Sequence, residues 1–560
     1  MKRYKLTYII SVVLLLVCVS CKDTLTEKPN SYYMKDNYFV SNANVELTLM
    51  GVYDVFAKLA HYGQWEMATP TSDDMYFVNG IVSDNTRRDI SHYNIQPSNS
   101  WIADIWKFKY QGIDRANYLL AGAETMDGYT EGDTQLLRLM AEARFLRALL
   151  AFDLVTYFGD VPFKTTYSTS ITDAYQPRTD REAIYDIIID DLNYAKEKLL
   201  WATATSSPER ATQGAARALL MRVYLQRAGY SLRMNGQMER PDDAKRQEYF
   251  KAVIKEWEAF QAEGYHDFYP GGYEALFKSF SQGVLNSKES IFELAFFSPS
   301  GDAEDSGVWG TWNGPLVDEP KGISSSENAN TMGRANAFFR VVPEWRGFFH
   351  NTDSRRDVVI CNYKYTWDAS TKTHVLATTN NRNWYPGKWR REWMPLGFKD
   401  PNNTDVNFCM LRYADVVLMA AEAYNETGNT PTAWTLLNSV RERAGAPTIT
   451  DANYSTLMKA PKVHNLPFID DADAAGKFRT ALYFERGFEL AYEGQRKWDL
   501  IRWGVLGDAL KLFNEKTVEA LKPNYPAGVN FTKGKHELFP IPLNEMQSNH
   551  LLESKNNPKY

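Results

Sequence analysis

The hydrophobic pattern of residues 410–445 predicts two antiparallel helices joined by a tight turn. Apolar side chains recur at helical spacing in both halves. They are Val416, Val417, Ala420, Ala421 and Tyr424 in the first half and Ala433, Leu437 and Val440 in the second. Gly428 suits the left-handed conformation that ends many helices. Thr430 is then expected to cap the second helix, with Pro431 at its first position, where the missing N–H costs nothing.

The same stretch fits the tetratricopeptide pattern, in which W-x2-L-G-x2-Y is followed by A-x3-F. The six places are occupied by Val417, Ala420, Ala421, Tyr424, Ala433 and Leu437. The consensus Trp and Gly are absent, so an ordinary antiparallel helix pair is the alternative. A single hairpin cannot bury its own apolar face, and we therefore expect similar hairpins to stack on it.

Helical periodicity marks six earlier stretches as well. The strongest covers residues 136–158 and ends before Gly159 and Pro162, which stop helices. The other five are residues 44–60, 101–123, 181–200, 212–227 and 247–262. Alanines in residues 212–227 permit the close helix approach that stacked hairpins require. The expected fold class is mainly α, a scaffold of tetratricopeptide-type helical hairpins.

The middle of the chain differs from both ends. No long helical period survives between residues 264 and 407, where Gly, Pro, Asn and aromatic residues are frequent. A stretch of this length is too long for one loop, so we expect an irregular, partly β insertion on the helical scaffold. It divides one body, residues 41–560, into an N-terminal helical part (41–263), the insertion (264–407) and a C-terminal helical part (408–560).

Charged residues in residues 478–504 recur three or four positions apart on two predicted helices. They are Arg486, Glu489 and Glu493, then Arg496, Asp499 and Arg502. A carboxylate pair could serve acid/base catalysis. Because compensating arginines keep acids ionised, we favour a charge network that joins two packed helices.

The first 40 residues have the pattern of a lipoprotein leader and tether. Lys2, Arg3 and Lys5 precede an apolar run, residues 6–19, that is short for a membrane span. Ser20 and Cys21 resemble a lipobox, which predicts a signal peptide over residues 1–20, a lipid on Cys21 and a tether over residues 21–40. The alternatives are lipidation at Cys18 and a plain secretory signal.

Composition excludes two broad classes. The 560 residues are 44% hydrophobic and 14% aromatic, which is too rich for a disordered chain. The net charge of −6 does not suit a nucleic-acid surface. Beyond Cys21 the mature chain has two cysteines, Cys361 and Cys409, whose pairing the sequence leaves open.

Catalytic and cofactor motifs are missing from the sequence. It contains no H-E-x-x-H, G-x-S-x-G or P-loop, and no G-x-G-x-x-G after a strand. Asp470, Asp471, Asp473 and Gly476 faintly follow a calcium loop, but the terminal Glu is misplaced. We therefore expect no metal and no cofactor. A glycosidase needs only two carboxylates, so a glycosidase activity stays open as an alternative.

Six ordered motifs make the chain resemble the SusD/RagB family, the surface nutrient-binding lipoproteins of Bacteroidota. The first is the lipobox cysteine, Cys21. The others are AEARFLRALLAFDLVTYFGDVPF (141–163), ATQGAARALLMRVYLQ (211–226), LRYADVVLMAAEAYNETGN with LNSVRERAG (411–429, 437–445), ERGFELAYEGQRKWDLIRWG (485–504) and ELFPIPLNEMQSNHLLESKNNPKY (537–560). Together they span nearly the whole chain.

The resemblance implies a non-catalytic protein that is lipid-anchored at the cell-surface side of the outer membrane. Such a protein captures an oligosaccharide and docks as a lid on a SusC-like TonB-dependent transporter. Peptide or glycopeptide capture by the same architecture is one alternative, and a surface glycosidase is another.

Sugar rings present apolar C–H faces beside hydroxyls, so glycan sites combine flat aromatic rings with Asp, Asn and Arg. Family members commonly place ligand aromatics in an early loop and in the middle insertion. The residues of this chain that fit are Trp65, Asp73, Asp74 and Tyr76 in the first region and Trp309, Trp312 and Asn313 in the second. The alternative for each ring is a place in the core.

Overall fold

The computed structural model describes residues 38–64, 71–78, 83–298, 303–396, 400–461, 469, 471–516 and 525–560. The predicted signal peptide, Cys21, most of the tether, Trp65 and Asp470 lie outside these residues. The helices of the scaffold form where hydrophobic periodicity predicts them. They are α3 (Asn42–Ala57), α6 (Ser100–Ala123), α8 (Thr134–Phe158), α10 (Arg181–Lys198), α11 (Gln213–Ala228) and α12 (Asp243–Glu263), followed after the insertion by α17 (Tyr413–Glu426), α18 (Thr430–Arg443), α20 (Ala474–Glu489) and α21 (Arg496–Arg502).

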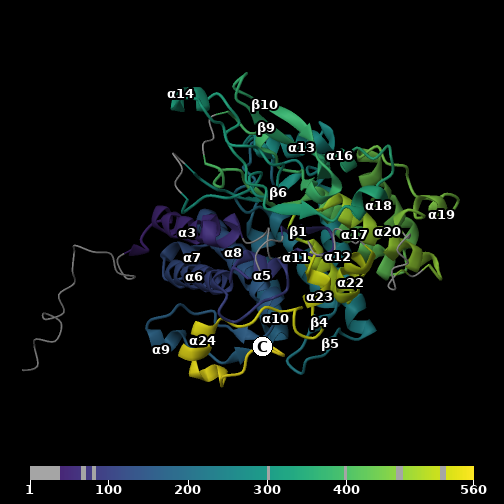
Figure 1. Ribbon diagram of the computed structural model, residues 1–560. Helices are drawn as coiled ribbons and strands as arrows, with labels where there is room; N and C mark the ends of the chain where they lie inside the picture. Colours follow the sequence, from purple (N-terminus) through teal and green to yellow (C-terminus); the bar gives the residue numbers. More distant parts are fainter. Residues whose placement is uncertain are drawn as a thin grey trace, which may run out of the picture.

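These helices pack in a continuous series. Helix α3 packs on α6, and α6 on α8, after which the pairs α8–α10, α11–α12 and α17–α18 follow one another. Helix α10 contacts α11, α12 contacts α17, and α20 covers both α17 and α18. Figure 1 shows the early helices on one side of the molecule and α17, α18 and α20 on the other. The predicted mainly α architecture of stacked hairpins is confirmed.

The hairpin of α17 and α18 follows its prediction except at one cap. Gly428 has a φ of +86°, the left-handed conformation that a glycine adopts at low cost. The N-cap of α18 is Asn429, whose side chain accepts from Thr432 N. Thr430 lies inside the helix instead, and its hydroxyl donates to Asn425 Oδ1 at 2.9 Å. Both residue types cap helices well, so the sequence alone did not separate them.

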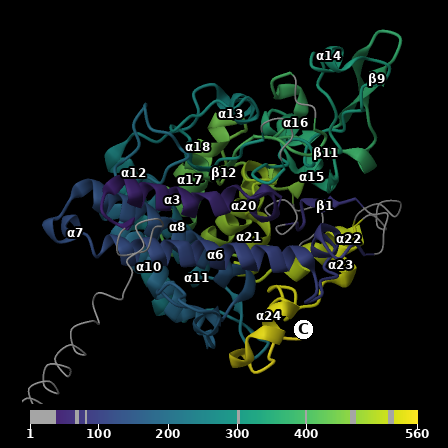
Figure 2. The same cartoon turned by 90° about the vertical axis from the view of Figure 1, so that its left-hand side faces the viewer.

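Short strands and helices make up the insertion, which lies above the helical scaffold in Figures 1 and 2. Strand β6 (Ser290–Leu294) pairs antiparallel with β12 (Phe408–Arg412), and a hairpin is formed by β9 (Tyr363–Asp368) and β10 (Thr373–Thr378). The insertion also contains helices α13 (Gly272–Ser281) and α16 (Arg355–Val359), which contact each other. Cys361 and Cys409 are buried and free, so the pairing that the sequence left open is absent between them.

The C-terminal segment returns to the N-terminal helices. Asn557 Nδ2 donates to the carbonyl oxygen of Phe158, and Phe539 N donates to that of Tyr157. This places α24 (Leu543–Ser548) near α6 and α9 (Ile171–Ala174), on the side of the molecule away from β9 and β10 (Figures 1 and 2).

Candidate ligand-binding site

The two stretches that the sequence offers as ligand regions lie side by side. Strand β1 (Met75–Phe77) of the early loop pairs antiparallel with β7 (Phe339–Val341) of the insertion. Tyr76 lies opposite Arg340 in this register, and the Phe77 ring packs edge-on against Phe339 at a centroid distance of 5.3 Å. The pairing joins the insertion to the N-terminal part of the chain, and we call this region the junction.

Six of the seven predicted ligand residues are buried. Their exposed fractions are 0% for Asp73, 3% for Asp74, 4% for Tyr76, 0% for Trp309, 7% for Trp312 and 0% for Asn313. Trp65 lies outside the described residues. A ring without an exposed face cannot stack on a sugar, so their burial corrects the expectation that these side chains stand free on loops.

Asp73 is bound by two groups from the C-terminal helices. Arg496 Nε and Tyr483 Oη donate to its carboxylate at 2.8 and 2.5 Å. The guanidinium of Arg496 also stacks on the Tyr483 ring, 4.2 Å from its centroid. A buried carboxylate with these partners fixes the early loop on α20 and α21 and has no free face for a ligand.

Asp74, the neighbouring acid, has a different environment. Its Oδ1 accepts from Met75 N at 2.8 Å. Burial, together with the charge of Asp73, raises the pKa of Asp74 to about 7. Its carboxyl is therefore close to half protonated at neutral pH, as expected for a buried acid beside a second carboxylate.

The predicted insertion residues Trp309 and Asn313 hold the insertion together. Trp309 stacks on Phe408 with centroids 4.5 Å apart and rings within 4° of parallel, and Asn313 Oδ1 accepts from Gly310 N at 2.8 Å. Phe408 belongs to β12, which leads directly into α17. These residues therefore connect the insertion to the hairpin scaffold.

A half-buried arginine, Arg87, lies over three aromatic rings at the junction. The guanidinium carbon of Arg87 lies 4.8, 5.2 and 5.3 Å from the ring centroids of Trp312, Phe338 and Phe77. Phe338 is half-buried. We call these four residues, Phe77, Arg87, Trp312 and Phe338, the junction cluster.

Arg87 has hydrogen-bonding capacity that the described residues do not use. Its Nε is buried without a partner, and its guanidinium makes no hydrogen bond or ion pair within the described chain. Burial lowers the pKa of Arg87, although an arginine stays charged in proteins. An unpaired cation among flat rings is costly unless a ligand or solvent satisfies it.

The sequence analysis missed Arg87 and Phe338. Arg87 is the first of two arginines that follow the early loop, and Phe338 begins a Phe–Phe pair inside the insertion. Phe339 faces the core while Phe338 is half-exposed, since successive strand residues point to opposite faces. A Phe–Phe doublet at the start of a strand was therefore the sequence signal that could have indicated Phe338.

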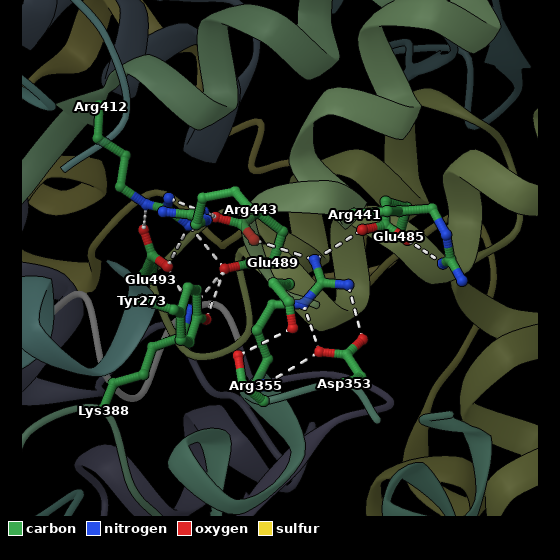
Figure 3. A network of polar contacts seen from close by, with 12 residues as sticks. Tyr273, Asp353, Arg355, Lys388, Arg412, Arg441, Arg443, Glu485, Glu489 and Glu493 are labelled. Carbon is green, nitrogen blue, oxygen red and sulfur yellow. Dashed lines mark hydrogen bonds and ion pairs between the residues drawn. The ribbon is translucent and has the colours of Figure 1, made fainter. Parts of the chain in front are cut away.

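A network of buried ion pairs between side chains holds the insertion on the scaffold (Figure 3). Arg355 of α16 donates to Asp353 at 2.7 Å and to Glu485 and Glu489 of α20 at 2.6 and 3.0 Å. All four of these side chains are at most 1% exposed. Such a network fixes the relative position of the insertion and the helices, because breaking one pair leaves a buried charge unmatched.

The same network continues into strand β12 and helix α18. Arg412 binds Glu289, Glu489 and Glu493, and Arg443 binds Glu289 and Glu489. Although burial opposes ionisation, Arg443, Arg412 and Arg355 hold the pKa of Glu489 far below its usual range. The predicted charge network between the two helices is found at Arg486 of α20 and Asp499 of α21, 2.7 Å apart. Glu489 and Glu493 pair instead with arginines outside these helices, and not with each other as an acid/base pair.

Metal binding and membrane crossing find no support in the described part of the chain. No group of three or more His, Cys, Asp or Glu side chains there could hold a metal. Of the faint calcium pattern, Asp473 caps α20 and Asp471 accepts from the Tyr454 hydroxyl. Among the described helices, none combines the length and the apolar character of a membrane span.

Two family models match this chain. The model of the SusD family matches residues 288–560, and a model described as starch-binding and associating with the outer membrane matches residues 23–225. A SusD-like protein, P25 of Formosa agariphila, is 27% identical over 97% of both chains.

Solved structures are similar over almost the full length. A SusD homolog from Bacteroides thetaiotaomicron is 28% identical, with a TM-score of 0.76 over 94% of this chain and 98% of its own. Surface glycan-binding protein A from the same organism, in complex with laminarihexaose, is 18% identical, with a TM-score of 0.66 over 92% and 99%. The second likeness shows the shared fold. With the family models, the relatives and the fold in agreement, the chain belongs to the SusD/RagB family.

Proposed function

We propose that this protein is a non-catalytic lipoprotein that captures a glycan at the outer membrane and delivers it to a SusC-like TonB-dependent transporter. The observation that carries the proposal is the full-length membership of a family with a starch-binding, outer-membrane description. The fold-level neighbour in complex with laminarihexaose supports glycan capture further.

The junction cluster is the proposed contact surface. The proposed contacts are the partly exposed Phe338 ring, which would pack on the C–H face of a sugar, and Arg87, whose unused N–H donors would bind the sugar hydroxyls. Trp312 and Phe77, the other two rings of the cluster, are almost fully buried and form its base. A shallow site of one ring and one cation gives an affinity in the micromolar to millimolar range.

The carboxylates of the junction support binding without turnover. A glycosidase places two carboxyl groups on either side of one glycosidic bond. Asp73 is buried against Arg496 and Tyr483, and Asp74 is 3% exposed. Neither can reach a bond that lies on the surface of the cluster.

Anchoring and delivery rest on the N-terminal motif and the family. The lipobox at Cys21 supports a lipid anchor, and the outer-membrane description of the family supports its location. Mild detergent extraction followed by affinity purification should recover a barrel-sized partner. Recovery of a lone monomer in several mild detergents would contradict delivery to a transporter.

Calorimetry on the purified protein tests the ligand class. Panels of neutral oligosaccharides, including laminarihexaose and maltohexaose, and of peptides are titrated, and reducing ends are assayed afterwards. We expect heat from at least one glycan and no released reducing ends. Turnover would establish a glycosidase, and binding of peptides alone would establish peptide capture.

A further inference from the structure

A pocket lies between α6, α9 and α24, on the side of the molecule away from β9 and β10. Its volume is about 400 Å³, within the range of small-molecule sites. Four aromatic rings line it, those of Trp106, Tyr110, Phe163 and Tyr175. We call it the α6 pocket. None of its residues belongs to the junction cluster.

The walls of the α6 pocket are fixed by hydrogen bonds. Tyr110 Oη donates to the carbonyl oxygen of Pro162 at 2.6 Å. Asn117 Nδ2 donates to the carbonyl oxygens of Lys164 and Thr166, both at 3.2 Å. Asp114 Oδ1 accepts from Ser168 N at 2.7 Å. The loop after α8 is thus tied to one face of α6, and a preorganised pocket loses little entropy on binding.

Polar groups with unused capacity stand beside the rings. Gln111 follows Tyr110 on α6 and also lines the pocket, and its side-chain amide has no partner within the described chain. Asp114 lines the pocket too, and one of its oxygens serves Ser168. Glu545 of α24 lines the pocket as well, and its Oε1 accepts from Asn549 Nδ2 at 3.0 Å.

We propose that the α6 pocket is a second carbohydrate site, which binds a neutral sugar unit through the half-buried rings of Tyr110 and Tyr175 and through Gln111 and Asp114. The inference rests on the proposed glycan capture and adds a site to it. A sugar matches both parts of the lining, because its C–H faces pack on rings and its hydroxyls both donate and accept.

Other ligand classes fit the pocket less well. An acyl chain would bury the amide of Gln111 without a partner and would desolvate the carboxylates of Asp114 and Glu545, at a cost in free energy. A phosphate group would meet those same carboxylates, which offset the charges of Lys107 and Lys164 in the lining, so the pocket has no excess of positive charge for an anion. An extended peptide binds most often along a free strand edge, whereas helix α6 and side chains form this wall.

Two sites on different faces would act together on a long glycan. Each site alone is shallow and weak, but a polymer held at one site raises the local concentration of its other units at the second. The affinity for a polysaccharide should then exceed the affinity for a short oligosaccharide by a factor larger than the ratio of their numbers of sugar units.

Substitutions of half-buried side chains test the inference without opening the core. Tyr175→Ala removes a ring from the loop wall, and Gln111→Ala removes the free amide. Tyr129→Ala on α7 (Asp127–Glu131) is the matched control, because Tyr129 is 37% exposed and does not line the pocket. Arg87→Ala impairs the junction cluster alone.

Calorimetry with the neutral oligosaccharide panel gives the number of sites, and hydrogen exchange of residues 163–176 locates the second one. We expect two sites in the parent and in Tyr129→Ala. In Tyr175→Ala and in Gln111→Ala the affinity of one site should fall about tenfold. This is the loss expected when an aromatic ring, or a hydrogen bond between neutral groups, is removed. Glycan should slow exchange in residues 163–176 of the parent and of Arg87→Ala.

Three results would overturn the inference. A single site that Arg87→Ala abolishes and Tyr175→Ala preserves would remove the second site and leave the proposed function standing. Unchanged exchange in residues 163–176 at saturating glycan would do the same. If no glycan of the panel binds the parent, the proposed function and the second site both fail.

Discussion

Arg496 and Asp73 form a buried bidentate ion pair, with Nε–Oδ1 and Nη2–Oδ2 distances of 2.8 Å, across 423 positions of sequence. The pair fixes the early loop, and with it strand β1, on the C-terminal helices. The junction cluster is built on that strand, so the most distant parts of the chain together decide its position.

Loss of the Asp73 carboxylate should destabilise the fold strongly. Asp73→Ala leaves Arg496 buried without its partner, and breaking one side of a buried pair costs about 3–5 kcal/mol. The free energy of unfolding in urea measures the loss. Asp243→Ala is the control, since the Asp243 side chain is 84% exposed and should change stability by less than about 0.5 kcal/mol. Equal effects of the two substitutions would show that the pair does not hold the loop.

The stacked hairpins leave no room for a larger side chain at Ala421. Ala421 is 0% exposed on α17, which packs on α12, α18 and α20. Ala421→Trp should lower the free energy of unfolding by about 1–3 kcal/mol or more through overpacking. Ala43→Trp is the matched control, because Ala43 lies exposed on α3. A melting temperature that stays at the parental value in Ala421→Trp would place this face at the surface.

Asp74 should make stability depend on pH. Burial and the charge of Asp73 raise its folded pKa to about 7 from the ordinary value of 3.8. The folded state therefore keeps a proton that the unfolded state loses. Its contribution to stability is present below about pH 4 and is lost as the pH rises to about 7, by a few kcal/mol.

The variant Asp74→Asn mimics the protonated acid and keeps an oxygen that can accept from Met75 N. At pH 8 it should match or exceed the parent in the free energy of unfolding, and at pH 4 the difference should shrink. Urea unfolding at both pH values measures this. A variant that loses as much stability at pH 8 as at pH 4 would contradict a raised pKa.

We propose, from the lipobox, that Cys21 carries the acyl anchor. Metabolic labelling with a fatty acid should fail in Cys21→Ala and persist in Cys18→Ala. Each buried methylene contributes about 0.8 kcal/mol to membrane binding, so Cys21→Ala should also leave the membrane fraction. Label retained in Cys21→Ala would show that another residue carries the lipid.

Periodicity predicted the scaffold because each helix buries a continuous apolar stripe. The expected helix of residues 136–158 is found as α8, Thr134–Phe158, and the hairpin of residues 410–445 as α17 and α18. The first residues of that hairpin form strand β12 instead. A short apolar run suits a buried strand as well as a helix, and the pairing with β6 decides between them.

The site was harder to predict because burial in the insertion depends on distant partners. Trp309 lies in a segment rich in Gly and Asn, which is typical of a loop, yet Phe408 stacks on it from 99 positions away. Arg87 shows no local pattern of its own, and its role follows from Trp312 and Phe338, which reach it through the β1–β7 pairing. The sequence indicated the two regions, and the tertiary contacts select the residues.

Glycan titration of junction variants tests the central claim most directly. Phe338→Ala removes the half-exposed ring, Arg87→Gln removes the unpaired cation, and Tyr129→Ala serves as the control with an exposed ring elsewhere. Each variant is first checked for a parental melting temperature and then titrated by calorimetry with the glycan that the parent binds. We expect junction affinity to fall about tenfold or more in the first two variants, since hydrogen bonds to charged groups contribute about 1.5–3 kcal/mol, and to stay parental in Tyr129→Ala. Parental affinity at every site in both Phe338→Ala and Arg87→Gln would contradict glycan capture at the junction.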